Sequence, residues 1–227
     1  MIKSKNFEDV LNIAREKNKK LYEICELLEA DTSEISTEEV RDRVKIILDA
    51  MKDAIEKGLK SKEKSMSGMC GDDCAKLLER YKSGHSLFSE TYQKVLTYSL
   101  ATIEQNLRMG KIVACPTAGS CGIVPAVIIA IAESINAGEE EQINALITAG
   151  LIGKIVANKL ALPGAAAGCQ SECGVAAAMA AAGLVEMYNG TNEQILSAAA
   201  LTLKNFMGLV CDPVAGLVEV PCVKRNA

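Results

Sequence analysis

The sequence contains one histidine and no tryptophan, and only 4% of its 227 residues are aromatic. Because His85 is the only imidazole, metal sites with two histidines and Cys₂His₂ zinc fingers are excluded within this chain. A Cys–His or Ser–His catalytic pair would have to use this residue. It lies in the turn KSGHSLF, so we interpret it first as a surface or capping residue.

A surplus of basic charge is also missing. The chain has 25 Lys and Arg residues against 29 Asp and Glu residues, for a net charge of −4. Proteins that bind nucleic acid need positive charge for the phosphates and aromatic rings for unpaired bases, so we expect no nucleic-acid partner. With 49% hydrophobic and 24% charged residues, the composition is typical of a globular chain with a substantial core.

Targeting and membrane segments are not expected either. The N-terminal MIKSKNFEDV is charged throughout and has no apolar region typical of a signal peptide. Residues 112–132 carry no charge, but prolines and glycines interrupt the first half, which predicts a loop followed by a buried helix. Nine cysteines cannot all pair, so we expect thiols or metal ligands in a reducing, cytoplasmic compartment.

Hydrophobic periodicity predicts an all-α fold, a bundle of several helices with long Gly/Pro/Cys loops. Ser36 with Glu39, and Thr191 with Gln194, form capping boxes that predict two helix starts. Gly110 is expected to follow a helix end. The predicted helices are Phe7–Glu29, one from Ser36 through Ile55, a short one from Asp72 or Asp73 to Arg80, Ser89–Met109, Pro125–Asn136, Glu140–Asn158, Gly174–Tyr188 and one from Thr191 through Phe206.

The chain changes character near residue 68. Residues 1–64 are charged and helical in pattern, and the stretch 61–73 has the composition of a linker. Residues 65–227 are more apolar and contain the uncharged loops. We therefore divide the chain into an N-terminal helical region, 1–64, and a second domain, 65–227.

Three uncharged loops are rich in Gly, Pro and Cys: residues 115–125, 162–174 and 208–227. Loops on a helical scaffold are where binding residues concentrate, and buried loop N–H groups need partners such as a ligand. The TAGSCG segment, 117–122, has glycines for close backbone approach, two hydroxyls and a following helix N-terminus, which suits a carboxylate or phosphate. An ordinary glycine-containing helix entry remains the alternative.

The cysteines allow several interpretations. Cys169, Cys211 and Cys222 are separated by 42 and then 11 residues, which matches no ferredoxin or zinc pattern, so spacing alone favours buried structural thiols. The pairs Cys70/Cys74 and Cys169/Cys173 are possible metal half-sites. The remaining thiols, Cys25, Cys115 and Cys121, are interpreted mainly as packing residues.

The motifs PTAGSCGIVPAV, GCQSECGVAAAMAAAGLVE and LKNFMGLVCDPVAGLVEVPCVKRNA closely resemble the α chain of the iron–sulfur L-serine dehydratases, from about Gly68 to Asn226. The resemblance implies a lyase of amino-acid degradation and gluconeogenesis that converts L-serine to pyruvate and ammonia without pyridoxal phosphate. It implies a [4Fe–4S] cluster held by Cys169, Cys211 and Cys222. Three ligands leave one iron open, which then acts as a Lewis acid on the serine hydroxyl.

The same resemblance assigns PTAGSCG to substrate binding, with Thr117, Gly119 and Ser120 as candidates to hold the carboxylate or amine of serine. Lys204 and Arg225 lie beside the cysteine motifs and are further candidates for the carboxylate, and no residue is assigned as the general base.

The family's α chain continues beyond the RNA motif, so this chain resembles one truncated at its C-terminus that holds the cluster loosely or not at all. A β chain is the expected partner. The alternatives are a non-catalytic helical scaffold with structural cysteines and a zinc or redox module.

Overall fold

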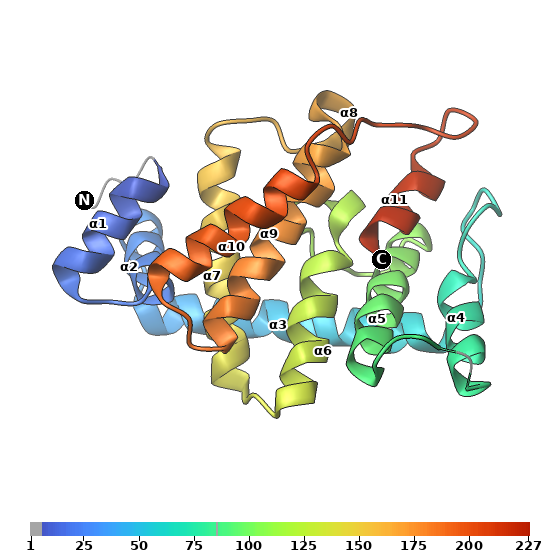
Figure 1. Cartoon of the computed structure of the whole chain (residues 1–227), viewed down its shortest axis with the longest axis horizontal. Coiled ribbons are helices and arrows are strands. Elements are labelled where there is room, and N and C mark those ends of the chain that lie inside the picture. The colour runs from blue at the N-terminus through green and yellow to red at the C-terminus, as the bar shows by residue number, and fades with distance from the viewer. Residues whose placement is uncertain (1–5, 85) are drawn as a thin grey trace.

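The computed structural model describes residues 6–84 and 86–227, so His85 lies outside the described residues. Over these ranges the chain is helical and has no strand beyond one isolated bridge, Val214 to Leu217, which confirms the all-α prediction. The elements, labelled in Figure 1, are α1 (Phe7–Lys17), α2 (Leu21–Ser33), α3 (Thr37–Lys60), α4 (Asp73–Lys82), α5 (Glu90–Leu107), the 3-10 turn η1 (Ala118–Ser120), α6 (Ile123–Ile135), α7 (Glu139–Ala157), α8 (Gly164–Ala167), α9 (Cys169–Met187), α10 (Asn192–Asn205) and α11 (Glu219–Asn226).

The two predicted helix caps are present. Ser36 Oγ accepts a hydrogen bond from the backbone N–H of Glu39 at 3.0 Å, at the start of α3. Thr191 and Gln194 form a reciprocal capping box before α10, with bonds of 2.8 and 3.2 Å. These side chains satisfy helix N–H groups that have no partner within the helix.

Two predicted boundaries are wrong because residues other than glycine adopt the left-handed conformation. The helix predicted over Phe7–Glu29 is two helices, and Asn18, with φ of 51°, ends α1 before α2 begins. After α5 the left-handed residue is Met109, with φ of 60°, and not Gly110. An amphipathic pattern continues across such a turn, so periodicity did not reveal the first break.

Parts of two predicted loops are helical. α9 begins at Cys169, five residues before the predicted start, and the loop predicted over 208–227 contains α11. Gly168, with φ of 79°, turns the chain into α9, and the N–H of Gln170 donates to Leu209 O at 2.8 Å. This long-range bond helps hold the first turn, and the local sequence does not reveal it.

The expected cap of α4 by Asp72 or Asp73 is also wrong. Asp72 precedes the helix but makes no side-chain cap bond. Instead Glu104 of α5, fully buried, accepts from the N–H groups of Asp73 and Cys74 at 2.7 and 3.2 Å and pairs with Arg108. A carboxylate at a helix N-terminus is favourable, and here the neighbouring helix supplies it.

The alanine-rich helix α9 lies at the centre of the molecule, between α7 and α10, and also contacts α6 (Figure 1). Its small side chains permit close packing: a Cβ added at Gly183 would lie 2.8 Å from Ala145 O of α7. The main apolar cluster combines side chains from the N-terminal helices and from the central ones, including Val10, Leu21, Leu48, Ile128, Ile152 and Val175.

The predicted buried helix after the TAGSCG loop is α6. The window Ala118–Ile135 is apolar and long enough to cross a membrane, yet 61% of it is buried inside the protein. Because α6 packs against α5 and α9, its apolar character is explained by its place in the core.

α3 passes behind α7, α6 and α5 in the view of Figure 1 and contacts all three. Gly58 lies at its contact with α5. A Cβ at this position would overlap the backbone carbonyl of Ala101 on α5. The two helices can approach this closely only because the residue is glycine.

We predict opposite effects of Gly58→Ala and Gly150→Ala on stability. The first should lower the free energy of unfolding by about 1–3 kcal/mol, because the methyl group meets backbone that cannot move aside. The second lies within α7 with open space around it and should raise stability by about 0.5–1 kcal/mol through helix propensity. Urea unfolding measures both, and equal effects would contradict the packing argument.

Candidate functional site

Three cysteines that are distant in sequence line one cavity of about 320 Å³, which we call the thiol cavity. Cys169 is the first residue of α9, Cys211 lies in the segment between α10 and α11, and Cys222 lies in α11. Other residues lining the cavity include Asn106, Gly119, Gly164, Glu172, Asp212 and Glu219.

The segment that carries Cys211 is tied to the start of α9. Gln170 N–H donates to Leu209 O at 2.8 Å, and Gly208 N–H donates to Gln170 Oε1 at 2.9 Å. A side chain at Gly168 would lie within 2.8 Å of Leu209 O, so glycine is required both for this contact and for its positive φ. The approach brings Cys211 to the same cavity as Cys169.

Arg225 of α11 connects these segments. Its guanidinium donates to Cys169 Sγ at 2.7 Å, to Val210 O at 3.0 Å and to Asp212 Oδ2 at 2.9 Å. These bonds hold the two cysteine segments together, and the substrate contact expected for Arg225 from the sequence stays a prediction. Lys204, the other basic candidate, is exposed in the last turn of α10 and is not among the cavity residues.

The TAGSCG loop approaches the cavity through part of its length. Gly119, in η1, lines the cavity, and Thr117 Oγ1 donates to the carboxylate of Glu172. Ser120 is fully buried, and its hydroxyl donates to Cys115 O at 3.3 Å. The structure therefore brings Thr117 and Gly119 toward the thiol cavity and turns Ser120 into the loop.

Asn226, which sequence reasoning did not single out, joins the loop to α11. Its side chain donates to Gly119 O at 2.8 Å and to Cys222 O at 2.7 Å, and accepts from Gly122 N–H at 2.8 Å. Ser99 of α5 donates to its backbone carbonyl. The residue is 6% exposed, so these bonds are shielded from water. Its place in the RNA motif was the one available signal.

Glu172 is the second residue that sequence reasoning missed. It lies in the first turn of α9, is 9% exposed and lines the thiol cavity. Its carboxylate lies against two glycines: a Cβ at Gly119 would be 2.6 Å from Oε1, and one at Gly164 would overlap Oε2. Its position one helical turn after Cys169 could have drawn attention to it.

The charges in the cavity bear on which groups it can hold. Burial raises the pKa of the Cys222 thiol to about 12, and negative charge on Glu172, Cys169 and Cys211 adds to the effect. Several thiols and a carboxylate in one cavity cannot all be ionised unless positive charge is supplied, and a bound metal supplies it.

The donor set also distinguishes between kinds of metal site. Within residues 6–84 and 86–227, no three His, Cys, Asp or Glu side chains are arranged to hold one metal ion. The three thiols line one cavity, and Cys thiolates are the usual ligands of iron–sulfur clusters. The chemistry of these donors therefore fits such a cluster.

The other cysteines lie in apolar clusters. Cys70, Cys74 and Cys121 belong to a cluster with Leu100 and Val223, and Cys74 Sγ donates to Thr97 O at 3.4 Å. Cys25, Cys115 and Cys173 belong to the main core. Burial raises the pKa of the Cys25, Cys74 and Cys121 thiols to about 12, which keeps them protonated at neutral pH.

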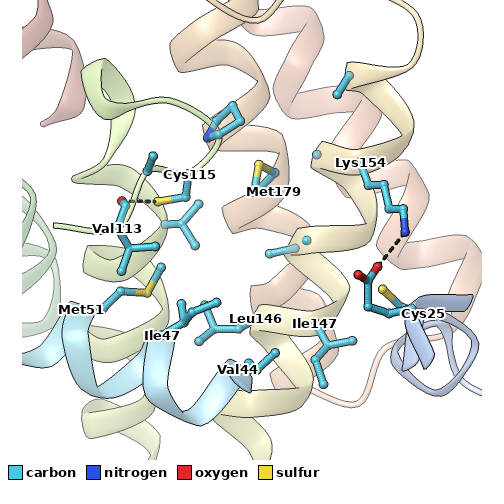
Figure 2. Close-up of a pocket in the computed structure, with 18 of the residues that line it drawn as sticks. Cys25, Val44, Ile47, Met51, Val113, Cys115, Leu146, Ile147, Lys154 and Met179 are labelled. Carbon is cyan, nitrogen blue, oxygen red and sulfur yellow. Dashed lines mark hydrogen bonds and ion pairs between the residues drawn. The ribbon is translucent and has the colours of Figure 1, made fainter. Parts of the chain in front are cut away.

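A second and larger pocket, of about 400 Å³, lies between α2, α3, α7 and the segment before η1, and Figure 2 shows its lining. Its walls are mainly aliphatic, and its charged side chains are Glu29 and Lys154, which pair at 2.6 Å. Because these two neutralise each other, the pocket lacks the converging polar groups of the thiol cavity. We therefore place the candidate site at the thiol cavity.

Comparison with known proteins agrees with the motifs. A family profile described as "Serine dehydratase alpha chain" matches residues 10–227, and the chain belongs to this family. A protein named "Probable L-serine dehydratase, alpha chain" from Bacillus subtilis (strain 168) is 44% identical over 223 residues, which cover 98% of this chain and 74% of that protein.

Two further relatives show how the similarity is distributed. The "L-serine dehydratase, alpha chain" of Peptoniphilus asaccharolyticus is 39% identical over 219 residues, covering 96% of this chain and 75% of its own length. "L-serine dehydratase 1" of Escherichia coli (strain K12) is 44% identical over 131 residues, covering 57% of this chain and 29% of that one. The resemblance identified from the motifs is confirmed at the level of the family.

We predict that Asn226→Ala lowers the free energy of unfolding by about 2–4 kcal/mol, because it leaves buried backbone groups of Gly119, Gly122 and Cys222 without partners. The matched control is Asn205→Ala, an exposed asparagine whose amide donates to Leu201 O one turn earlier in the same helix. It should change stability by about 0.5 kcal/mol or less. Urea unfolding compares the two, and equal losses would contradict the role of Asn226.

Proposed function

We propose that this chain is the α subunit of an L-serine dehydratase, a lyase that converts L-serine to pyruvate and ammonia. Membership of the serine dehydratase alpha chain family supports this reaction, as do the names of the relatives. The observation that carries the proposal is the thiol cavity, where three cysteines from separate segments meet the loop that contains Gly119. We further propose a β chain as partner and a reducing, cytoplasmic location.

The proposed cofactor is a [4Fe–4S] cluster held by Cys169, Cys211 and Cys222, with no pyridoxal phosphate. When bound, a cluster with only three protein ligands supplies an open iron, which acts as a Lewis acid on a hydroxyl group. The donor set and the shared cavity support this proposal.

The protein residues around this cavity have separate tasks. Arg225 donates a hydrogen bond to Cys169 Sγ, which fixes the direction of this side chain. Asn226 holds the η1 turn against α11, so the loop and Cys222 keep their separation. Gly119 lines the cavity beside the carboxylate of Glu172, and its lack of a side chain leaves room for a ligand to approach the loop backbone there.

We predict that Cys169→Ser, Cys211→Ser and Cys222→Ser each abolish a broad absorbance near ~400 nm after anaerobic reconstitution with iron and sulfide, because cluster ligands are thiolates. Cys25→Ser is the matched control and should retain the absorbance, since Cys25 is not among the residues that line the thiol cavity. A colourless wild-type protein, even with the β chain present, would rule out the cluster. Bound zinc that is lost with Cys70 or Cys74 would favour a zinc module instead.

We predict that the anaerobically reconstituted chain with its β partner forms pyruvate and ammonia from L-serine in equal amounts, and that exposure to air ends the activity together with the visible absorbance. Pyruvate is measured by its reduction in a coupled assay. Loss of absorbance with full retention of activity would contradict a catalytic cluster.

A further inference from the structure

Glu172 is a buried carboxylate without an ion-pair partner in the described part of the chain. It is 9% exposed, and among the residues that the structure describes no Lys or Arg forms an ion pair with it. The other two carboxylates of the thiol cavity are less buried: Asp212 pairs with Arg225, and Glu219 accepts hydrogen bonds from Ser65 and Ser67. A buried charge without a counter-charge is costly, so this position is suited to a cationic ligand.

The carboxylate lies at the N-terminal end of a helix. Glu172 is in the first turn of α9, where the helix dipole is favourable to a negative charge. Thr117 Oγ1 donates to Oε1, whereas no donor to Oε2 is found in the described part of the chain. One carboxylate oxygen is therefore held by the protein, and the other remains available to a ligand.

The surroundings of this carboxylate match one part of an amino acid. Gly119 lies directly beside Oε1, and Thr117 bonds to it, so the loop proposed to receive a substrate carboxylate adjoins the anion. An α-amino acid carries its carboxylate and its ammonium on the same carbon. Two adjacent subsites, one for each charge, are what such a ligand requires.

We propose that Glu172 binds the α-ammonium group of the substrate and so selects amino acids over carboxylic acids that lack this group. This inference rests on the proposed function, because it takes the ligand of the thiol cavity to be an α-amino acid. Thr117 is then a positioning residue that orients the carboxylate, while Gly119 and Gly164 leave the space that it occupies.

The test compares L-alanine with propanoate, which differ only in the ammonium group and carry no hydroxyl to eliminate. Calorimetry on the reconstituted protein with its β chain measures both dissociation constants. The wild type should bind L-alanine about 10–100-fold more tightly than propanoate, as expected for a charge-assisted bond to a buried carboxylate. Glu172→Gln should reduce this preference to about 3-fold or less, with propanoate binding unchanged or tighter.

The matched control is Glu186→Gln. Glu186 lies on the same helix, is 5% exposed, and is paired with Lys20 at 3.7 Å, away from the thiol cavity. This variant should keep the wild-type preference for L-alanine. If Glu172→Gln keeps it too, the inference is wrong. It is also wrong if Glu172→Gln lowers kcat for L-serine without changing either dissociation constant, since Glu172 would then act on the reacting atoms.

Glu172→Asp provides a second measurement if the glutamine variant does not fold. This variant keeps the charge but withdraws it by one methylene. L-Alanine should therefore still bind more tightly than propanoate, but by a smaller factor than in the wild type. Equal weakening of both ligands would overturn the inference. The proposed reaction is tested separately: if wild type prefers L-alanine but makes no pyruvate, the reaction fails and the ammonium site stands.

Discussion

The side chain of Asn226 is the contact on which the arrangement of the candidate site depends. One amide reaches both sides of the TAGSCG loop, at Gly119 and Gly122, and also the carbonyl of Cys222. The loop precedes α6 and the cysteine lies in α11, so the bonds join segments more than a hundred residues apart. Because these bonds are buried, breaking them leaves backbone N–H and C=O groups without a partner, since water cannot replace the lost hydrogen bonds there.

The charges that line the thiol cavity indicate which ligands it can hold. Three thiols and the carboxylate of Glu172 face one space, and Arg225 provides a positive group that touches Cys169. A cavity with this balance is suited to ligands that bring positive charge. In our proposals the iron of a cluster supplies one part of that charge and the ammonium of an amino acid supplies the other.

Local signals predicted the helices well and their ends less well. Ser36 and Thr191 are capping residues whose partners lie three residues away, so their bonds were readable from the sequence. The cap of α4 comes from Glu104, about thirty residues further on, and the start of α9 is held by Leu209. Neither of these two partners has a local sequence signature, which is why the capping group of α4 and the start of α9 were misjudged.

The sequence by itself determined that the chain is helical, that α6 and α9 are core helices, and that its motifs belong to the serine dehydratase alpha chain family. It did not determine which thiols meet, because separations of 42 and 11 residues contain no information about distance in space. The tertiary structure decided that Cys169, Cys211 and Cys222 share a cavity, that Ser120 turns away from it, and that Glu172 faces it. Such placements depend on how helices pack and on hydrogen bonds between distant segments, and only the folded chain contains both.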